Sequence, residues 1–155
     1  MNNIIPLIGL FSPFIIAIIN CLSLWSRPKY LAAYILFFFI GVGINKILKQ
    51  IIRQDRPIGG KSISDWENYE GTERYGMPSA HSQSVAYSIA FLYWVTGSVR
   101  LLLVELFLAA LMLYQRWSFH RHTWEQLGVG LFVGAFIGGF SVYLTDVYLR
   151  KRIRS

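Results

Sequence analysis

Long apolar runs separated by short polar breaks dominate the first third of the chain. The first run extends from Ile4 to about Trp25 and ends at Arg27-Pro28-Lys29, and a second extends from Tyr30 to about Leu48. Because roughly 20 apolar residues cross a bilayer as a helix, both runs predict membrane spans. The first run is too long for the apolar part of a signal peptide and has no basic segment before it, so we expect it to be retained.

Three more helices are predicted in the second half of the chain, where apolar runs are again separated by short breaks. The predicted ranges are about Ser79 to Thr96, Val99 to Tyr114 and Thr123 to Leu149. In the last of these, Gly130, Gly134 and Gly138 recur every four residues, which indicates a face for close helix packing. The fold class predicted is therefore all-α, an integral membrane bundle of about five transmembrane helices in a single domain over residues 1–155.

Composition supports a membrane protein. The 155 residues are 54% hydrophobic and 15% charged, well below the ~25% charge of soluble domains. The net charge of +7 fits Lys and Arg flanking apolar segments, so we expect no nucleic-acid partner. Cys21 is the single cysteine, which excludes an intrachain disulfide.

The longest polar stretch runs from Lys49 to Met77. A loop of this length in a small protein is usually functional. Its acidic residues are Asp55, Asp65, Glu67, Glu70 and Glu73. We expect the acidic run from Asp65 to Glu73 to be solvated rather than to bind a metal.

The distribution of basic residues predicts an orientation in the membrane. Five spans place the long loop and the segment between the last two helices on one side, with eight Lys and Arg against seven on the other. Without the candidate catalytic cations Lys49, Arg56 and Arg116, the counts become five and seven. The tail from Arg150 to Arg154 is therefore predicted to be cytosolic, and the polar site lumenal or extracellular.

A basic stripe is predicted where the second helix leaves the membrane. Lys46, Lys49, Arg53 and Arg56 are spaced three, four and three residues apart, and Pro57 is expected to end the helix. Taken alone, such a stripe is also typical of cationic side chains that reach lipid headgroups from a helix end.

A histidine is predicted in the first turn of the third helix. His81 follows Pro78-Ser79-Ala80, and Ser79 is suited to cap the helix. The free N–H groups and positive end of a helix start favour an anion. An isolated histidine at this position also fits a capping or interfacial role.

A third cluster lies between the fourth and fifth helices. It contains Arg116, His120, Arg121 and His122, and Gln126 lies one turn beyond His122 on the same face. An interfacial cluster is an alternative reading of these residues. Zinc is a poor explanation, because His120 and His122 would diverge on a helix and no thiolate or carboxylate pair completes a ligand set.

The three clusters converge on one side of the membrane in the predicted topology. Phosphoryl transfer requires positioned cations, backbone donors, a nucleophile and an acid, and the clusters together supply this combination.

The order and spacing of these residues resemble a known family. Lys49 is followed after six residues by Arg56-Pro57; Pro78-Ser79-Ala80-His81 comes next; and Arg116 is followed after five residues by His122 and after three more by Gln126. These segments resemble the three signature motifs of the type 2 phosphatidic acid phosphatase superfamily, which also includes vanadium haloperoxidases. Haloperoxidase activity is disfavoured because those relatives are soluble.

Two positions depart from the usual motifs. Ala80 replaces a glycine but keeps its backbone N–H, and Gln126 stands where the superfamily usually has aspartate. The segments Gly76 to Gln83 and His122 to Gln126 look like the dolichyldiphosphatase branch, whose third motif also carries glutamine. The resemblance therefore implies a phosphatase for a polyprenyl diphosphate such as dolichyl diphosphate, without metal or organic cofactor.

The resemblance also implies roles for individual residues. His122 would form a phosphohistidine, His81 would protonate the departing lipid phosphate and then activate water, and Gln126 would orient His122 in place of the neighbouring Glu125. The groups implied to hold phosphate oxygens are Lys49, Arg56, Arg116 and the backbone N–H groups of Ser79 and Ala80. Arg53 and Lys61 could contact a second phosphate, although solvated loop charges are the more frequent case.

Several alternatives remain open on the sequence. The substrate could be phosphatidate, phosphatidylglycerol phosphate or undecaprenyl diphosphate, because no residue measures the lipid tail. The chain could instead be an inactive lipid-binding or scaffold subunit assembled through the glycine face of the last helix. The expected partners are a lipid diphosphate and the bilayer, with a possible homo-oligomer. The implied location is the endoplasmic reticulum with a lumenal site, or the plasma membrane in a prokaryote.

Overall fold

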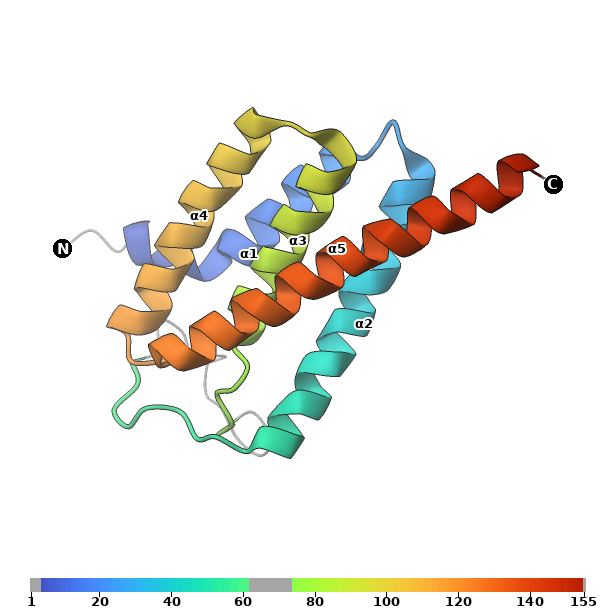
Figure 1. Ribbon diagram of the computed structural model, residues 1–155. Helices are drawn as coiled ribbons and strands as arrows, with labels where there is room; N and C mark the ends of the chain where they lie inside the picture. The colour runs from blue at the N-terminus through green and yellow to red at the C-terminus, as the bar shows by residue number, and fades with distance from the viewer. Residues whose placement is uncertain (1–3, 62–73, 155) are drawn as a thin grey trace.

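The computed structural model describes residues 4–61 and 74–154, which form a bundle of five helices (Figure 1). The helices are α1 Ile4–Ser23, α2 Pro28–Ile52, α3 Ala80–Thr96, α4 Val99–Ser118 and α5 Trp124–Arg154. Within the described ranges the only strand-like feature is an isolated bridge between Asp55 and Tyr75. The all-α prediction is confirmed.

The second helix ends earlier than Pro57 predicted. Pro28 begins α2, where its missing N–H leaves no helical bond unmade, and Arg53 ends it in the left-handed conformation with φ 53°. The prediction that all four cations lie on one helix is therefore wrong, because Arg53 is the C-cap of α2 and Arg56 lies in the loop beyond it. The turn after Ile52 redirects the chain across the end of the bundle.

Serine side chains begin the two central helices. The Ser79 hydroxyl accepts a hydrogen bond from the Ser82 N–H, and the Ser98 hydroxyl accepts one from the Leu101 N–H. Gly97 ends α3 with φ 64°, a conformation that glycine adopts without steric cost. α4 continues to Ser118, four residues beyond its predicted end, so Arg116 lies in its last turn.

α3 is the central helix and contacts each of the other four. Its buried side chains include Val85, Tyr87 and Phe91, and the Tyr87 ring stacks on Tyr34 of α2 with centroids 5.5 Å apart. The most extensive helix pairs are α3 with α5 and α1 with α4. This arrangement holds the first turn of α3 firmly against its neighbours.

The glycine face predicted on the last helix lies against α3. Cβ atoms built at Gly130, Gly134 and Gly138 would approach backbone atoms of α3 and its cap within 2.1–2.7 Å. The absence of side chains therefore permits the close approach of α5 to α3. Since α3 covers this face, assembly of a scaffold through it is contradicted by the structure.

Three helices, α1, α2 and α5, are long and apolar enough to cross a membrane. Large apolar side chains point outward from them, including Leu22 at 69%, Phe39 at 68% and Phe132 at 74% exposure. Such exposure is costly in water and favourable in lipid. The chain is a multi-pass membrane protein.

The two remaining helices pack beside these candidate spans. α3 has 17 residues, and α4 carries Arg100, Glu105 and Arg116. α3 is the shortest of the five helices.

Candidate active site

Four segments meet at one end of the bundle (Figure 1). They are the end of α2 with the loop that follows it, the start of α3, the end of α4 and the start of α5. The structure thus brings together the residues that the sequence singled out in three separate clusters. The Asp65, Glu67, Glu70 and Glu73 positions lie outside the described residues.

His122 lies between two partners of opposite hydrogen-bonding character. Its Nδ1 is 3.1 Å from Gln126 Oε1, and its Nε2 is 3.0 Å from an Arg56 guanidinium nitrogen. A carbonyl oxygen only accepts and a guanidinium only donates. His122 is therefore neutral with the proton on Nδ1, and the lone pair of Nε2 faces Arg56.

Gln126 holds His122 and also helps to cap the start of α5. Its backbone N–H donates to the Thr123 hydroxyl at 3.2 Å, and its Oε1 accepts from the Thr123 N–H at 3.3 Å. This reciprocal pair is a capping box, which satisfies two donors at a helix start. The sequence Thr123-Trp124-Glu125-Gln126 carries the signature of that motif, and sequence analysis missed it. Glu125 is exposed.

His81 pairs with Arg116 across the site. An Arg116 guanidinium nitrogen is 2.6 Å from His81 Nε2, and Arg116 is fully buried in the last turn of α4. Because guanidinium donates, His81 Nε2 accepts and the ring is neutral in this arrangement.

Both site histidines have pKa values well below the ordinary value. Burial is the largest cause of the low pKa of His81, followed by the positive charges of Arg116 and Arg56. Burial also lowers the pKa of His122, as do Arg56 and Arg116, while the Gln126 hydrogen bond opposes the shift. Both rings are therefore neutral near pH 7 before an anion enters.

Two of the four stripe cations enter the site. Lys49 is buried, and its Nζ donates to the Tyr75 carbonyl oxygen at 2.9 Å, while Arg56 also donates to the Arg121 carbonyl oxygen at 3.2 Å. Lys46 and Arg53 are exposed. Lys46 and Lys49 both lie on α2, whereas Arg53 is its C-cap and Arg56 follows it, so one cation of the helix and one of the loop enter the site.

The start of α3 differs from expectation at Ser79. The Ser79 N–H, which the resemblance implied would hold a phosphate oxygen, donates to the Gln126 carbonyl oxygen at 3.0 Å and is already engaged within the protein. Ala80 is exposed and is the first residue of α3, where a backbone N–H has no helical partner. The Ala80 N–H is therefore a candidate backbone donor for a phosphate oxygen.

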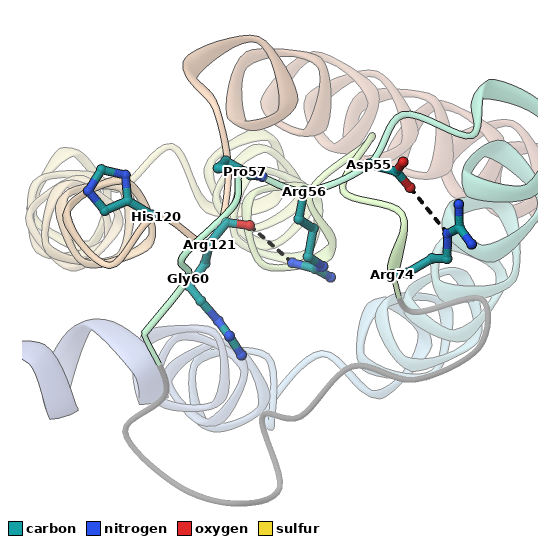
Figure 2. Close-up of a pocket in the computed structure, with 7 residues that line it drawn as sticks. All are labelled: Asp55, Arg56, Pro57, Gly60, Arg74, His120 and Arg121. Atoms are coloured by element: carbon teal, nitrogen blue, oxygen red, sulfur yellow. Dashed lines mark hydrogen bonds and ion pairs between the residues drawn. The ribbon is translucent and has the colours of Figure 1, made fainter.

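A polar cavity of about 420 Å³ opens beside Arg56 (Figure 2). Its lining residues are Asp55, Arg56, Pro57, Gly60, Arg74, His120 and Arg121. The Arg121 side chain is 7% exposed, whereas His120 is exposed and makes no described contact with His81 or His122. Lys61 is exposed and its N–H donates to the Phe119 carbonyl oxygen.

Sequence analysis also missed the groups that contact the Nε2 atom and the amide of Gln126. Gln126 Nε2 donates to the Asp55 carbonyl oxygen at 2.9 Å and to Gln54 Oε1 at 3.1 Å. A Cβ at Gly76 would lie 2.3 Å from Gln126 Oε1. No sequence pattern links these positions, since residues 54 and 126 are brought together only by the fold. Among the described residues, no group of His, Cys, Asp or Glu is placed to hold a metal ion.

The fold and the site define an integral membrane helical bundle that gathers two histidines and several buried cations at one end. The PAP2 superfamily model matches residues 30–149, and the chain belongs to the PAP2 superfamily.

Several proteins with similar sequences are named as dolichyldiphosphatases. The chain is 29% identical over 149 residues to Dolichyldiphosphatase 1 of Homo sapiens, covering 86% of this chain and 60% of that protein. It is 31% identical over 114 residues to Dolichyldiphosphatase of Saccharomyces cerevisiae, covering 66% of this chain and 46% of that protein. The chain thus spans about 60% or less of these relatives' lengths.

A solved structure has the same fold. The transmembrane PAP2 type phosphatidylglycerolphosphate phosphatase from Bacillus subtilis matches with a TM-score of 0.66 and 19% identity, covering 95% of this chain and 74% of that one.

Proposed function

We propose that this protein is a lipid phosphatase that hydrolyses a polyprenyl diphosphate, such as dolichyl diphosphate, to the monophosphate and inorganic phosphate. The observation that carries the proposal is the neutral His122 ring, with its Nε2 lone pair directed at Arg56 and its Nδ1 proton held by Gln126. A neutral imidazole with a directed lone pair, next to cations that bind phosphate, is suited to nucleophilic attack on phosphorus.

In the first step, His122 Nε2 attacks the terminal phosphorus. The P–N bond forms as the bond from phosphorus to the bridging oxygen breaks, and the electron pair leaves with that oxygen. His81 supplies a proton to the departing lipid monophosphate. The products of this step are the lipid monophosphate and a phosphohistidine.

In the second step, water attacks the phosphohistidine. His81, now neutral, accepts a proton from the water, and the P–N bond breaks with its electron pair returning to Nε2. Inorganic phosphate leaves, and His122 is again neutral with its proton on Nδ1.

Charge at the site supports this role for His81. In the structure without substrate, burial and Arg116 keep the pKa of His81 low. A bound diphosphate carries negative charge and draws Arg116 toward its oxygens, which reverses both the repulsion and the hydrogen bond that oppose protonation. His81 therefore gains its proton when substrate binds.

The cations take the place that a metal ion has in other phosphoryl-transfer sites. Lys49, Arg56 and Arg116, with the Ala80 N–H, would hold the oxygens of the transferring phosphoryl group. The Ser79 oxygen accepts from the Ser82 N–H, so its hydroxyl hydrogen is a further donor. No metal or organic cofactor is part of this mechanism.

The choice of a polyprenyl diphosphate rests on the resemblance of both histidine motifs to the dolichyldiphosphatase branch and on the names of the relatives. The proposed location is the endoplasmic reticulum membrane with the site in the lumen, opposite the cytosolic basic tail. A prokaryotic source would place the protein in the plasma membrane.

The test is phosphate release by purified protein in detergent from dolichyl diphosphate, undecaprenyl diphosphate and phosphatidate. We expect kcat/KM for polyprenyl diphosphates to exceed that for phosphatidate by at least about tenfold, a discrimination of ~1.4 kcal/mol. Rapid quenching with terminally ³²P-labelled substrate should trap an acid-labile phosphoenzyme that His122→Ala lacks. Equal or reversed preference would contradict the substrate, and absence of the phosphoenzyme together with activity in His122→Ala would contradict the mechanism.

A further inference from the structure

A glutamine that orients a catalytic histidine faces a problem that an aspartate does not. Both oxygens of a carboxylate accept hydrogen bonds, whereas a carboxamide has one oxygen and one NH₂ group. If the Gln126 amide were rotated by half a turn, its NH₂ would donate to His122 Nδ1. That arrangement would require the proton on Nε2, where the nucleophilic lone pair is needed.

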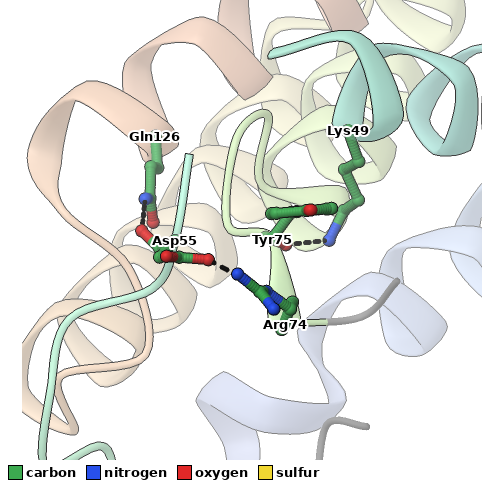
Figure 3. Close-up of polar contacts among 5 residues, drawn as sticks. All are labelled: Lys49, Asp55, Arg74, Tyr75 and Gln126. Carbon is green, nitrogen blue, oxygen red and sulfur yellow. Dashed lines mark hydrogen bonds and ion pairs between the residues drawn. The ribbon is translucent and has the colours of Figure 1, made fainter. Parts of the chain in front are cut away.

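Backbone groups define both ends of the amide. Gln126 Oε1 accepts from the Thr123 N–H at 3.3 Å. Gln126 Nε2 donates to the Asp55 carbonyl oxygen at 2.9 Å (Figure 3). A rotated amide would place two donors together at Thr123 and two acceptors together at Asp55. These contacts assign the amide orientation without reference to His122.

The Gln54 side chain also helps to fix the orientation of the Gln126 amide. Gln54 Oε1 accepts the second hydrogen of Gln126 Nε2 at 3.1 Å. The backbone carbonyl of Gln54 accepts from the Gly76 N–H at 2.8 Å, and the bridge between Asp55 and Tyr75 joins the same two segments. Residues 54–55 and 75–76 are therefore linked to each other next to the Gln126 amide.

Gly76 allows residues 75–76 to lie close to the Gln126 amide. A Cβ there would lie 2.3, 2.5 and 2.6 Å from Oε1, Cδ and Nε2 of Gln126, so every atom of the carboxamide group packs against the glycine. Gln126 is fully buried beneath these contacts. A side chain at residue 76 would therefore displace the amide from this position.

We propose that Gln54 is a positioning residue: with the Asp55 carbonyl and Gly76 it holds the Gln126 amide in the orientation that keeps His122 protonated on Nδ1. The proposal rests on the proposed function for its catalytic consequence, since Nε2 acts as nucleophile only in that tautomer. Its structural content, the coupling of residue 54 to the His122 tautomer, is independent of any substrate.

The direct test is ¹⁵N NMR of histidine-labelled protein in detergent, because Nδ1 and Nε2 of a neutral ring have distinct shifts when protonated. The chain has three histidines, so His122→Ala assigns the signals. In Gln54→Leu, which removes the acceptor, we expect a measurable population with the proton on Nε2. Gln54→Glu retains acceptors and should keep the wild-type tautomer.

Matched variants separate this effect from a general disturbance. Gln50→Leu makes the same change at an exposed position on α2 and should alter neither tautomer nor activity. Gln126→Glu removes the distinction between the two ends of the side chain. In the Gln126→Glu background, Gln54→Leu should no longer shift the tautomer, because a carboxylate accepts from Nδ1 in either orientation.

Activity gives the second readout. The loss of one hydrogen bond predicts that Gln54→Leu lowers kcat about fivefold with KM unchanged, and that Gln54→Glu rescues it. An unchanged His122 tautomer in Gln54→Leu would overturn the proposal even in an active phosphatase. A shifted tautomer in a protein that releases no phosphate from any lipid would support the positioning role and contradict the proposed function instead.

Discussion

Replacing Gly134 with alanine tests the central helix contact of the fold. A Cβ at this position would lie 2.1 Å from the Gln83 carbonyl oxygen, 2.9 Å from its carbonyl carbon and 3.0 Å from Ala86 Cβ. Two of these three atoms belong to the α3 backbone, which cannot rotate away as a side chain can. The substitution therefore forces the two helices apart.

The required movement follows from the contact distances. Ordinary van der Waals contact begins near 3.4 Å, and 3.4 − 2.1 leaves a separation of 1.3 Å to be gained at Gly134. Such overpacking costs about 1–3 kcal/mol, and the intrinsic helix preference of alanine over glycine returns about 1 kcal/mol. Because the clash is with backbone, we expect the upper end of the cost and a net loss of about 2 kcal/mol.

The assay is thermal unfolding of the purified protein in detergent. A loss of about 2 kcal/mol corresponds to a Tm lowered by roughly 4–8 °C in a chain of this size. Gly128→Ala is the matched control on α5, because nothing lies within 4 Å of a Cβ there. Its Tm should stay the same or rise.

The refuting result is a Tm for Gly134→Ala equal to that of Gly128→Ala, since α3 and α5 would then not be in contact at this position. Gly130→Ala extends the reasoning to the site. Its Cβ would lie 2.6 Å from the Ser79 carbonyl oxygen and 2.9 Å from Ser82 Cβ, at the turn that carries His81. We expect it to lower kcat as well as Tm.

Four further predictions concern the site and the orientation. Gln126→Ala should lower kcat by ~10² or more, comparable to the loss of other preorganised hydrogen bonds, and Glu125→Ala should not; near-normal kcat across a pH profile in Gln126→Ala would exclude it as the orienting residue. Gln126→Glu places a carboxylate beside His122, which raises the pKa of that histidine, so the loss of kcat/KM on acidification should begin at higher pH than in the wild type, and an unmoved acidic limb would contradict this. Activity should survive EDTA, and loss restored by a divalent ion would contradict the mechanism. A glycosylation acceptor placed between residues 61 and 74 should be modified in microsomes, and modification of a tagged C-terminus instead would invert the topology.

The helices were predictable because their signals are local. An apolar run of about 20 residues, a proline at a helix start or a serine cap acts within one or two turns, so the five helices were identified and their bounds mostly differ by a few residues. The end of α2 was misjudged because Arg53 adopts a left-handed conformation, which glycine or asparagine usually adopts. An arginine at this position therefore gives no sequence signal for the end of the helix. The glycine repeat predicted a close contact, and only the structure identifies α3 as its partner.

His122 and Gln126 are four residues apart in the sequence, which is about one helical turn. The sequence therefore determined that Gln126 could reach His122. The convergence of Lys49, Arg56 and His81 on them depended on how four helix ends pack together. That packing also engaged the Ser79 N–H with the Gln126 carbonyl, and it brought Gln54 and Gly76 beneath an amide far away in the chain. Short-range spacing in the sequence determines which residues can share a helix face. Contacts between distant segments depend on burial and steric fit over the whole bundle, so only the tertiary structure decided those contacts.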